Sequence, residues 1–466
     1  MKRISVHVLF FAFLVLITGC SGSGEVTSTT RDASTGGVSF NFDLGVLQQA
    51  TPHLLKSGMV SGTTTTITAV TVTLSRNGYS DIVADLTVAN NAASGTISGL
   101  EQGYWHISAD VYSDQSLIYT GSVDVNIIAG ATVSAEILFD PVSVDPGTTT
   151  GSVTVSVGLN KYPGYSKIQQ YVSTILLDTV KQKFYIIDSS ACVLAVYDAA
   201  TLVREQDITL QAAPQAAAVD TAGGSVLLGY SSGKLYRLTI TDQSMTMLAD
   251  TLLSISSILP VSTDFALVGN GSSWSSSNTY ETINLGNGQI VSSKSYWYPL
   301  SNFVYNPVAG MAYALDSGIS PADMHHLAIN ATTGSIDSIG DSRYHGDYSF
   351  NSPIRLFSSG TRLATGSGNM FISSSSTTDD ITYAGNLGHT CTDLAADDDL
   401  GLLYVLNSDS IQKLLVIDQS TFFTTVTVDL INGPKRVFNT PDNIIVFAQP
   451  DTDYYVKAIS KTSIGL

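Results

Sequence analysis

The chain has 466 residues, of which 44% are hydrophobic and only 13% are charged. The hydrophobic share rules out wholesale disorder, and the net charge of −18 argues against a nucleic-acid partner, because phosphate neutralisation requires clustered Lys and Arg. Abundant Ser, Thr, Val, Ile and Tyr, together with scarce Glu, predict an all-β protein.

Residues 1–19 have the organisation of a signal peptide. Lys2 and Arg3 precede an apolar stretch, Val6–Leu16, that is too short to span a bilayer. The stretch runs into the sequence Leu-Ile-Thr-Gly-Cys, which ends at Cys20 and resembles the bacterial lipobox. This resemblance implies cleavage before Cys20 and acylation of its thiol, so that the lipid bilayer becomes a partner. The alternative is an ordinary cleaved signal peptide followed by a chance cysteine.

Residues 20–36 are rich in Ser, Gly and Thr and predict a flexible tether. Several acyl chains on one cysteine anchor durably, because each buried methylene contributes about 0.8 kcal/mol. Ser21, in the place where Asp would retain a lipoprotein at the inner membrane, implies the outer membrane. The face of the envelope, periplasmic or external, stays open.

From residue 37 to residue 140, apolar and polar residues alternate between turn signals, which is typical of strands with one buried face. The expected strands are Val38–Phe42, Ile67–Leu74, Ile82–Val88, Gly95–Leu100, Tyr104–Tyr112, Ser122–Ile128 and Thr132–Phe139. Seven short strands in about 100 residues predict a small β-sandwich. Residues 141–150, with two prolines, predict a linker.

The run Ala93–Ile107 resembles the "G-x-I-x-G-L-x-x-G-x-W/Y-x-I" stretch of transthyretin-like and immunoglobulin-like accessory domains in bacterial surface proteins. The resemblance covers about a quarter of the domain. Trp105 and His106 are neighbours in an expected strand, so we expect a core Trp105 beside an exposed His106. A sugar-binding pair is the alternative.

Residues 151–466 contain an internal repeat. Equivalent positions, each at the end of a first strand, recur at spacings of 39 to 52 residues: Asp178, Asp220, Ser262, Asn306, Ser358, Asp397 and Asn439. Four short strands in a period near 40 to 45 residues are typical of β-propeller blades. The sequence therefore predicts a seven-bladed propeller.

The first and sixth units share the form "L-Y-V-x-N-S … V-I-D-x-x-T", as in Phe184–Thr201 and Leu403–Thr421. This form resembles the YVTN-type and lactonase-like propeller repeats of secreted bacterial proteins. A lactonase-like metal site would require Glu and Asn at strand starts. No Glu follows Glu281, which leaves few candidates for a catalytic Glu.

The last unit supplies only three strands. Val153–Leu159 alternates cleanly before the first unit, and we predict that it closes the ring as the outermost strand of the seventh blade. Cys192 and Cys391 fall in the first and sixth units, too far apart to be bridged, so two free and buried thiols are expected.

Three local features could carry chemistry. Tyr296, Trp297 and Tyr298 are the candidate ligand-binding residues, with packing between blades as the alternative. The histidines His325, His326 and His345 are expected in an exposed loop, and Asp397–Asp399 is expected to form a turn rather than a Ca²⁺ site. No catalytic residue, metal or cofactor is predicted.

These observations favour an envelope lipoprotein whose propeller is a binding scaffold for a protein or a glycan. A hydrolase or lactonase-type enzyme with an active site at the mouth of the central channel is the competing hypothesis. A propeller supports either, because its function depends on the residues mounted on it.

Overall fold

The computed structural model describes residues 35–44, 47, 66–135, 137–142, 161–271, 278–316, 320–408 and 412–466. The signal peptide, Cys20, most of the tether, residues 143–150 of the linker and Val153–Leu159 lie outside this set. Among the residues that are described, no helix is long and apolar enough to cross a membrane.

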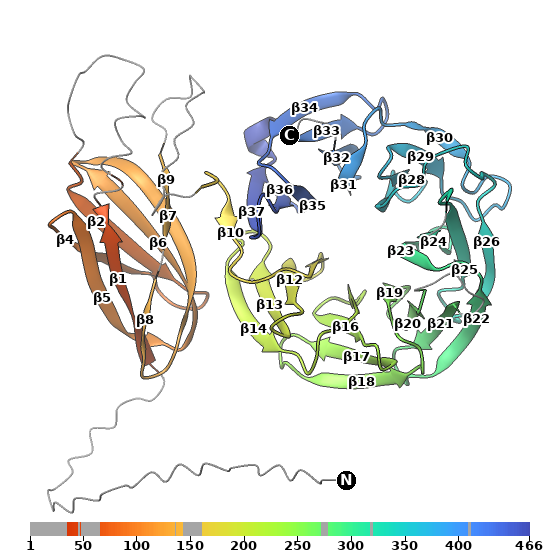
Figure 1. Ribbon diagram of the computed structural model, residues 1–466, viewed down its shortest axis with the longest axis horizontal. Coiled ribbons are helices and arrows are strands. Elements are labelled where there is room, and N and C mark those ends of the chain that lie inside the picture. The colour runs from red at the N-terminus through yellow and green to blue at the C-terminus, as the bar shows by residue number, and fades with distance from the viewer. Residues whose placement is uncertain are drawn as a thin grey trace, which may run out of the picture.

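The fold is all β, as predicted, with a two-sheet sandwich followed by a ring of seven four-stranded sheets (Figure 1). The sandwich strands are β1 (Thr35–Asp43), β2 (Ala69–Ser75), β3 (Ile82–Asp85), β4 (Thr87–Ala89), β5 (Ala92–Glu101), β6 (Gly103–Ser113), β7 (Ser116–Ile127), β8 (Thr132–Ser134) and β9 (Leu138–Pro141). One sheet has the order β4-β5-β1-β8 and the other β3-β2-β6-β7-β9. Among the strands that the structure describes, β1 and β8 are the one pair that runs parallel.

Alternation along β6 sends Trp105, Ile107, Ala109 and Val111 into the sandwich core. Trp105 is 2% exposed and donates its indole N–H to the carbonyl of Glu101 at 2.9 Å, so its predicted core position is confirmed. The buried indole therefore leaves no unpaired donor.

Two expected strands divide between the sheets. The segment Ile82–Val88 becomes β3 in one sheet and β4 in the other, and Thr132–Phe139 becomes β8 and β9. At the first crossing Leu86 is buried and its N–H donates to the carbonyl of Val70 at 2.8 Å. Strands of a sandwich change sheets at such corners. The strand β1 also begins at Thr35, inside the segment expected to be tether.

Each blade is an antiparallel meander, and the first six blades follow the chain in order. Their strands are β11 (Thr174–Asp178), β12 (Lys183–Asp188), β13 (Val193–Asp198) and β14 (Arg204–Thr209); β15 (Ala216–Val219), β16 (Ser225–Gly229), β17 (Lys234–Thr239) and β18 (Met245–Asp250); β19 (Ser257–Pro260), β20 (Phe265–Gly269), β21 (Asn278–Asn284) and β22 (Ile290–Tyr296); β23 (Leu300–Asn306), β24 (Met311–Asp316), β25 (Met324–Ile329) and β26 (Ile336–Asp341); β27 (Ile354–Phe357), β28 (Arg362–Thr365), β29 (Asn369–Ile372) and β30 (Tyr383–Asn386); β31 (Cys391–Asp397), β32 (Leu402–Asn407), β33 (Lys413–Asp418) and β34 (Thr424–Asp429).

The seventh blade joins the two ends of the propeller. Its order is β10-β37-β36-β35, with β35 (Pro434–Asn439), β36 (Asn443–Ala448) and β37 (Tyr455–Ser460) from the C-terminal end and β10 (Ser166–Lys167) from the N-terminal end. The pairing continues past β10, because Ile168 donates its N–H to the carbonyl of Tyr454 at 2.8 Å. The ring therefore closes by the predicted device. The described strand beside β37 is β10, and the predicted closing strand, Val153–Leu159, lies outside the described residues.

The two cysteines of the propeller are free thiols in blades 1 and 6, which confirms that no disulfide links them. Cys391 is buried, and burial raises the pKa of its thiol to about 12. Cys192 is only half-buried, contrary to the expectation that both would be enclosed. It follows a tight turn in a left-handed conformation, at φ 53°, where the chain is near the surface.

Breaking the closure should weaken the propeller. Ile168→Pro removes the N–H that binds the Tyr454 carbonyl, together with part of a side chain that is 4% exposed. We expect the free energy of unfolding to fall by about 2–4 kcal/mol. Ile168→Val keeps the N–H and should cost about 1 kcal/mol. Urea unfolding of the two variants would measure this, and equal midpoints would contradict the role assigned to this pairing.

Candidate functional site between sandwich and propeller

The sandwich lies beside the propeller, with the outer face of its β6–β7 sheet turned toward blades 1 and 7 (Figure 1). Because side chains alternate along a strand, β6 presents Tyr104, His106 and Ser108 on this outer face while Trp105 points inward. The neighbouring strand of the propeller is β14, the outermost strand of blade 1. The two domains therefore meet through a polar sheet face and a strand edge.

A group of five residues, here called the domain latch, holds this contact. The Tyr104 hydroxyl donates to Asp207 Oδ2. One oxygen of Asp124 lies 2.8 Å from His106 Nδ1, and the other accepts the backbone N–H of Arg204 at 2.8 Å. The Arg204 guanidinium binds Asp207 Oδ1 through Nε at 2.9 Å and Nη2 at 2.6 Å. Each domain thus contributes a carboxylate that accepts a hydrogen bond from the other domain.

Arg204 is the most enclosed charged group of the domain latch. Arg204 is 9% exposed, and its guanidinium carbon lies 5.3 Å from the Tyr104 ring centroid and 5.9 Å from that of Tyr197. Stacking of this kind favours a planar cation over a desolvated aromatic face. Burial and the hydrogen bond to Asp207 both raise the pKa of Tyr104 well above its ordinary value, so the phenol stays a donor at all physiological pH values.

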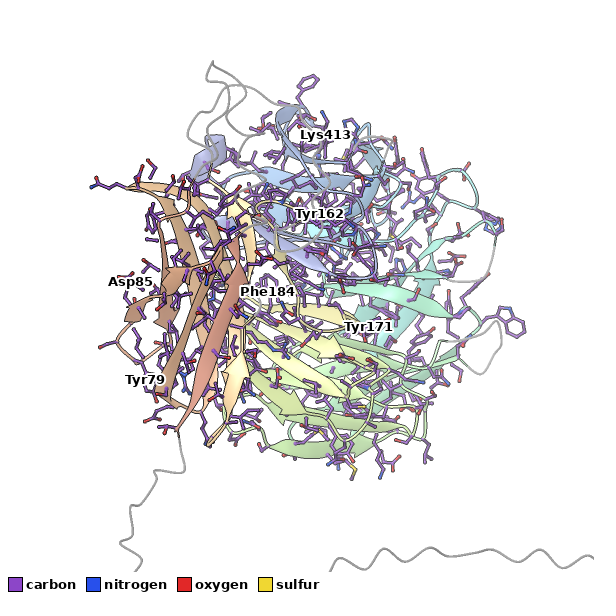
Figure 2. All side chains as sticks on the ribbon, turned by 60° about the vertical axis from the view of Figure 1, so that its left-hand side comes forward. Tyr79, Asp85, Tyr162, Tyr171, Phe184 and Lys413 are labelled. Carbon is purple, nitrogen blue, oxygen red and sulfur yellow. The ribbon has the colours of Figure 1, made fainter. Side chains whose placement is uncertain are left out.

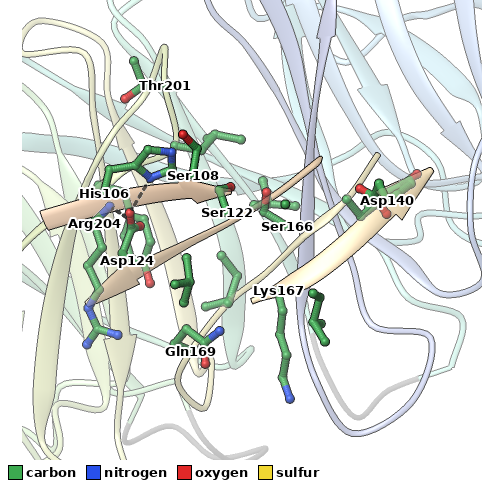
Figure 3. Close-up of a pocket in the computed structure, with 18 of the residues that line it drawn as sticks. His106, Ser108, Ser122, Asp124, Asp140, Ser166, Lys167, Gln169, Thr201 and Arg204 are labelled. Carbon is green, nitrogen blue, oxygen red and sulfur yellow. Dashed lines mark hydrogen bonds and ion pairs between the residues drawn. The ribbon is translucent and has the colours of Figure 1, made fainter. Parts of the chain in front are cut away.

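Two cavities flank the domain latch. The first has a volume of about 360 Å³ and lies between the outer sheet face, the β10 segment and blade 1 (Figure 3). Its polar lining consists of His106, Ser108, Thr120, Ser122, Asp124, Asp140, Ser166, Lys167, Gln169, Thr201 and Arg204. Hydroxyl, amide and carboxylate groups dominate this wall, which gives a ligand both donors and acceptors.

The second cavity, of about 590 Å³, opens on the other side of the domain latch and shares His106, Thr201 and Arg204 with the first. Its sandwich wall includes Tyr79, which lies at the margin of the sandwich and is 42% exposed (Figure 2). The Arg76 guanidinium lies 4.8 Å from the Tyr79 ring centroid, which fixes the ring.

The propeller wall of the second cavity is acidic. Asp198 and Glu205 line it, and Lys183 Nζ bridges them at 2.9 Å and 2.7 Å. Burial by itself would raise the pKa of Asp198, but hydrogen bonds from Lys183 and Thr201 outweigh it, and the pKa is lowered. The carboxylate is therefore held ionised by its own neighbours, with Oδ1 accepting from Ala200 and Thr201 and Oδ2 from Lys183.

The predicted aromatic site lies elsewhere, in the connection between β22 and β23. Trp297 is 50% exposed, whereas Tyr296 and Tyr298 are half-buried against His325. The Tyr296 hydroxyl lies 3.0 Å from His325 Nδ1, and the Tyr298 ring centroid lies 4.7 Å from that of His325. The two tyrosines thus pack between blades, while the Trp297 carbonyl accepts from Asn278 Nδ2 at 3.2 Å. None of the three lines either cavity described above.

The expectation that the histidines occupy an exposed loop is wrong for two of them. His325 is fully buried on β25 with Nε2 3.1 Å from Asp316 Oδ2, and His326 Nδ1 lies 2.7 Å from Asp380 Oδ2. The two adjacent rings do point to opposite faces, as alternation requires. A carboxylate partner offsets the cost of burying each imidazole. Only His345 is exposed.

The predicted turn at Asp397–Asp399 is confirmed. Asp397 Oδ1 accepts the N–H of Leu400 at 3.2 Å, and Asp398 accepts the N–H of Ser359 at 2.7 Å. Within the described part of the chain, no group of three or more His, Cys, Asp or Glu side chains is placed to hold a metal ion.

Together, the two cavities form a groove between the sandwich and the propeller. The sequence does not predict this groove, because its residues come from distant segments of the chain. His106 was noticed only as the neighbour of Trp105. Asp124 and Arg204, which join the domains, are 80 residues apart and carry no shared local pattern. A polar outer face on β6 and β7 was the only available signal, and it is equally typical of a solvated sheet.

Known proteins resemble this chain in fold only. No protein-family model and no curated protein sequence matches it. Among solved structures, the hydrazine synthase of Kuenenia stuttgartiensis is similar, with 14% identity, a TM-score of 0.45, and coverage of 66% of this chain and 99% of that chain. The β-propeller domain of Cps50 (Swd1) from Myceliophteria thermophila has 9% identity, a TM-score of 0.47, and coverage of 63% and 99%.

Removing the shared carboxylate of the domain latch should loosen the two domains. Asp124→Ala leaves the Arg204 N–H and the His106 ring without their acceptor, so we expect a larger radius of gyration and faster proteolysis between residues 141 and 161. Asp110→Ala is the matched control, because Asp110 lies on the same face of β6 but bonds only within the sandwich, to Thr120. Identical scattering profiles for both variants would contradict this role.

Proposed function

We propose that the protein is a lipid-anchored component of the bacterial cell envelope that binds a polar ligand, a glycan or a peptide segment, in the groove between sandwich and propeller. The observation that carries this proposal is the pair of cavities of about 360 and 590 Å³ on either side of the domain latch. Volumes in this range suit small ligands or a few residues of a chain.

The chemistry of the groove supports a polar ligand. Hydroxyls of Ser108, Ser122 and Ser166 face the first cavity, and the exposed ring of Tyr79 stands at the second. Sugars and peptides combine hydroxyl or amide groups with apolar faces, which suit hydrogen-bonding side chains beside an aromatic ring. A net charge of −18 further favours a neutral or cationic ligand here.

Binding is favoured over hydrolysis because the side chains that resemble a catalytic pair are engaged in contacts between the two domains. His106 and Asp124 form a hydrogen-bonded pair, but the second oxygen of Asp124 holds the Arg204 backbone. General acid–base chemistry requires such a pair to reach a substrate proton. Here it joins two domains.

The anchor is proposed on the sequence Leu16–Cys20 and the basic and apolar segments before it. Residues 20–36 would separate the acylated cysteine from the sandwich. This arrangement would place the sandwich nearer the bilayer and the propeller beyond it, which suits a module that presents a binding surface.

Loss of the lipid should release the protein. Cys20→Ser removes the thiol that accepts the acyl chain, so we expect the protein to leave the membrane fraction and signal peptide processing to stop. Fractionation with immunoblotting and metabolic labelling with palmitate would measure both effects. Unchanged membrane retention of Cys20→Ser would contradict the proposed lipid anchor. It would not bear on ligand binding in the groove.

Filling the first cavity should abolish ligand binding. Ser122→Trp places a large ring in the groove, and Thr96→Trp adds the same ring to an exposed position of β5 in the other sheet. A glycan and peptide array identifies the ligand, and titration calorimetry compares the variants. We expect at least a tenfold loss of affinity for Ser122→Trp and none for Thr96→Trp. Equal affinity of the ligand for the unaltered protein and for both variants would exclude the groove as its binding site.

A further inference from the structure

Charged residues interrupt the apolar pattern of the inner strands in three consecutive blades. Arg355 is the second residue of β27, while Asp393 and Arg436 are the third residues of β31 and β35. Arg355 and Arg436 each stand three residues before the repeated turn position of their blade. Blades 1 to 4 have apolar residues at that place: Ile175, Ala217, Leu259 and Phe303. A residue that departs from the repeat, and that the scaffold does not require, is a candidate for a functional role.

The three side chains form one ion cluster across blades 5, 6 and 7. Asp393 is 1% exposed, and its Oδ1 accepts from Arg355 Nη2 at 2.6 Å. Its Oδ2 accepts from Arg436 Nε at 2.9 Å and from the backbone N–H of Val437 at 3.1 Å. The carboxylate is therefore saturated by the groups that hold it.

The cluster carries one surplus positive charge, because two guanidinium groups share a single carboxylate. Both arginine side chains are about one-third exposed, at 33% for Arg355 and 37% for Arg436. Arg436 uses only Nε toward Asp393, and among the described residues neither of its Nη atoms has an acceptor. A guanidinium edge with two free N–H groups matches an oxyanion with two oxygens.

An aromatic ring packs against the guanidinium of Arg436. Its guanidinium carbon lies 4.8 Å from the Phe438 ring centroid, which orients the plane of the group. Phe438 is itself held by Phe184 and Phe447, with ring centroids 5.2 and 5.9 Å away, so the orientation of the guanidinium is fixed.

We propose that Arg355 and Arg436 form a binding site for a carboxylate-bearing small molecule on the inner strands of the propeller, separate from the groove at the sandwich. The two Nη atoms of Arg436 hold the carboxylate, and Arg355 adds charge through the shared Asp393. One surplus charge matches a monovalent carboxylate. A phosphate dianion would leave excess negative charge in a protein whose net charge is already −18.

The test uses the detergent-solubilised full chain and titration calorimetry at low ionic strength with three probes. Sodium glucuronate carries one carboxylate, glucose is its uncharged analogue, and sodium phosphate is the other oxyanion. We expect saturable binding of glucuronate and none of glucose. Arg436→Gln should weaken glucuronate binding at least tenfold. Arg343→Gln, which removes the same charge from an exposed arginine bonded to the Thr378 carbonyl, should leave it unchanged.

Two further variants keep the proposal open to refutation. Arg436→Lys retains the charge and the contact with Asp393 but lacks the two-pronged edge, so an intermediate, several-fold loss is expected even if Arg436→Gln fails to fold. Ser122→Trp, which blocks the groove, should not change glucuronate binding. The arginine site and the groove are therefore tested independently of each other. Absence of glucuronate binding, equal binding by Arg436→Lys and the unaltered chain, or binding of phosphate alone would overturn the proposal.

Discussion

The ring depends on one recurrent interaction, in which a polar side chain at the end of an inner strand holds its own turn and also binds a neighbouring blade. Asp178 shows it most fully. Its Oδ1 accepts the N–H groups of Val180 and Lys181, while its Oδ2 accepts from the Tyr185 hydroxyl and from the N–H of Gly224 in blade 2. A blade exposes two apolar faces, so it is stable only when its neighbours are fixed against it. A carboxylate with two oxygens serves both needs from one position.

The same position uses different chemistry around the ring. Asn306 accepts at Oδ1 from its own turn and donates at Nδ2 to the carbonyl of Gly360 in blade 5. Gly360 has φ +83°, and a Cβ there would lie 2.9 Å from Asn306 Oδ1, so only glycine permits this approach. Asp397 instead binds Lys461 of the last blade at 2.7 Å. Two positions differ. The partner of Asp220, Arg237, belongs to its own blade, and Asn439 donates to the carbonyl of Ala396 in the preceding blade.

This constraint explains how much of the fold the sequence predicts. The seven turn positions recur because each has a structural role, and residues with the same role in every blade recur at a regular spacing in the sequence. The closing strand is different, since β10 has two residues and its pairing with β37 is a backbone interaction that selects no side chain. The alternation of apolar and polar residues in Val153–Leu159, by contrast, is visible in the sequence. His325 was misplaced for a related reason: its burial depends on Asp316 and Tyr296, which reach it only in the folded blades.

The contact between the domains follows a different logic from the contacts between blades. Blades bury continuous apolar clusters such as Phe184, Ile186 and Phe447 between neighbours, whereas sandwich and propeller meet through the charged and hydroxyl groups of the domain latch. A polar contact gains little free energy over hydration of the same groups, so the docked arrangement is held less firmly than either domain is folded. A ligand that touches both walls of the groove binds the docked arrangement alone, and mass action then stabilises docking by the free energy of that binding. On the proposed function, ligand binding in the groove and docking of the two domains are therefore coupled.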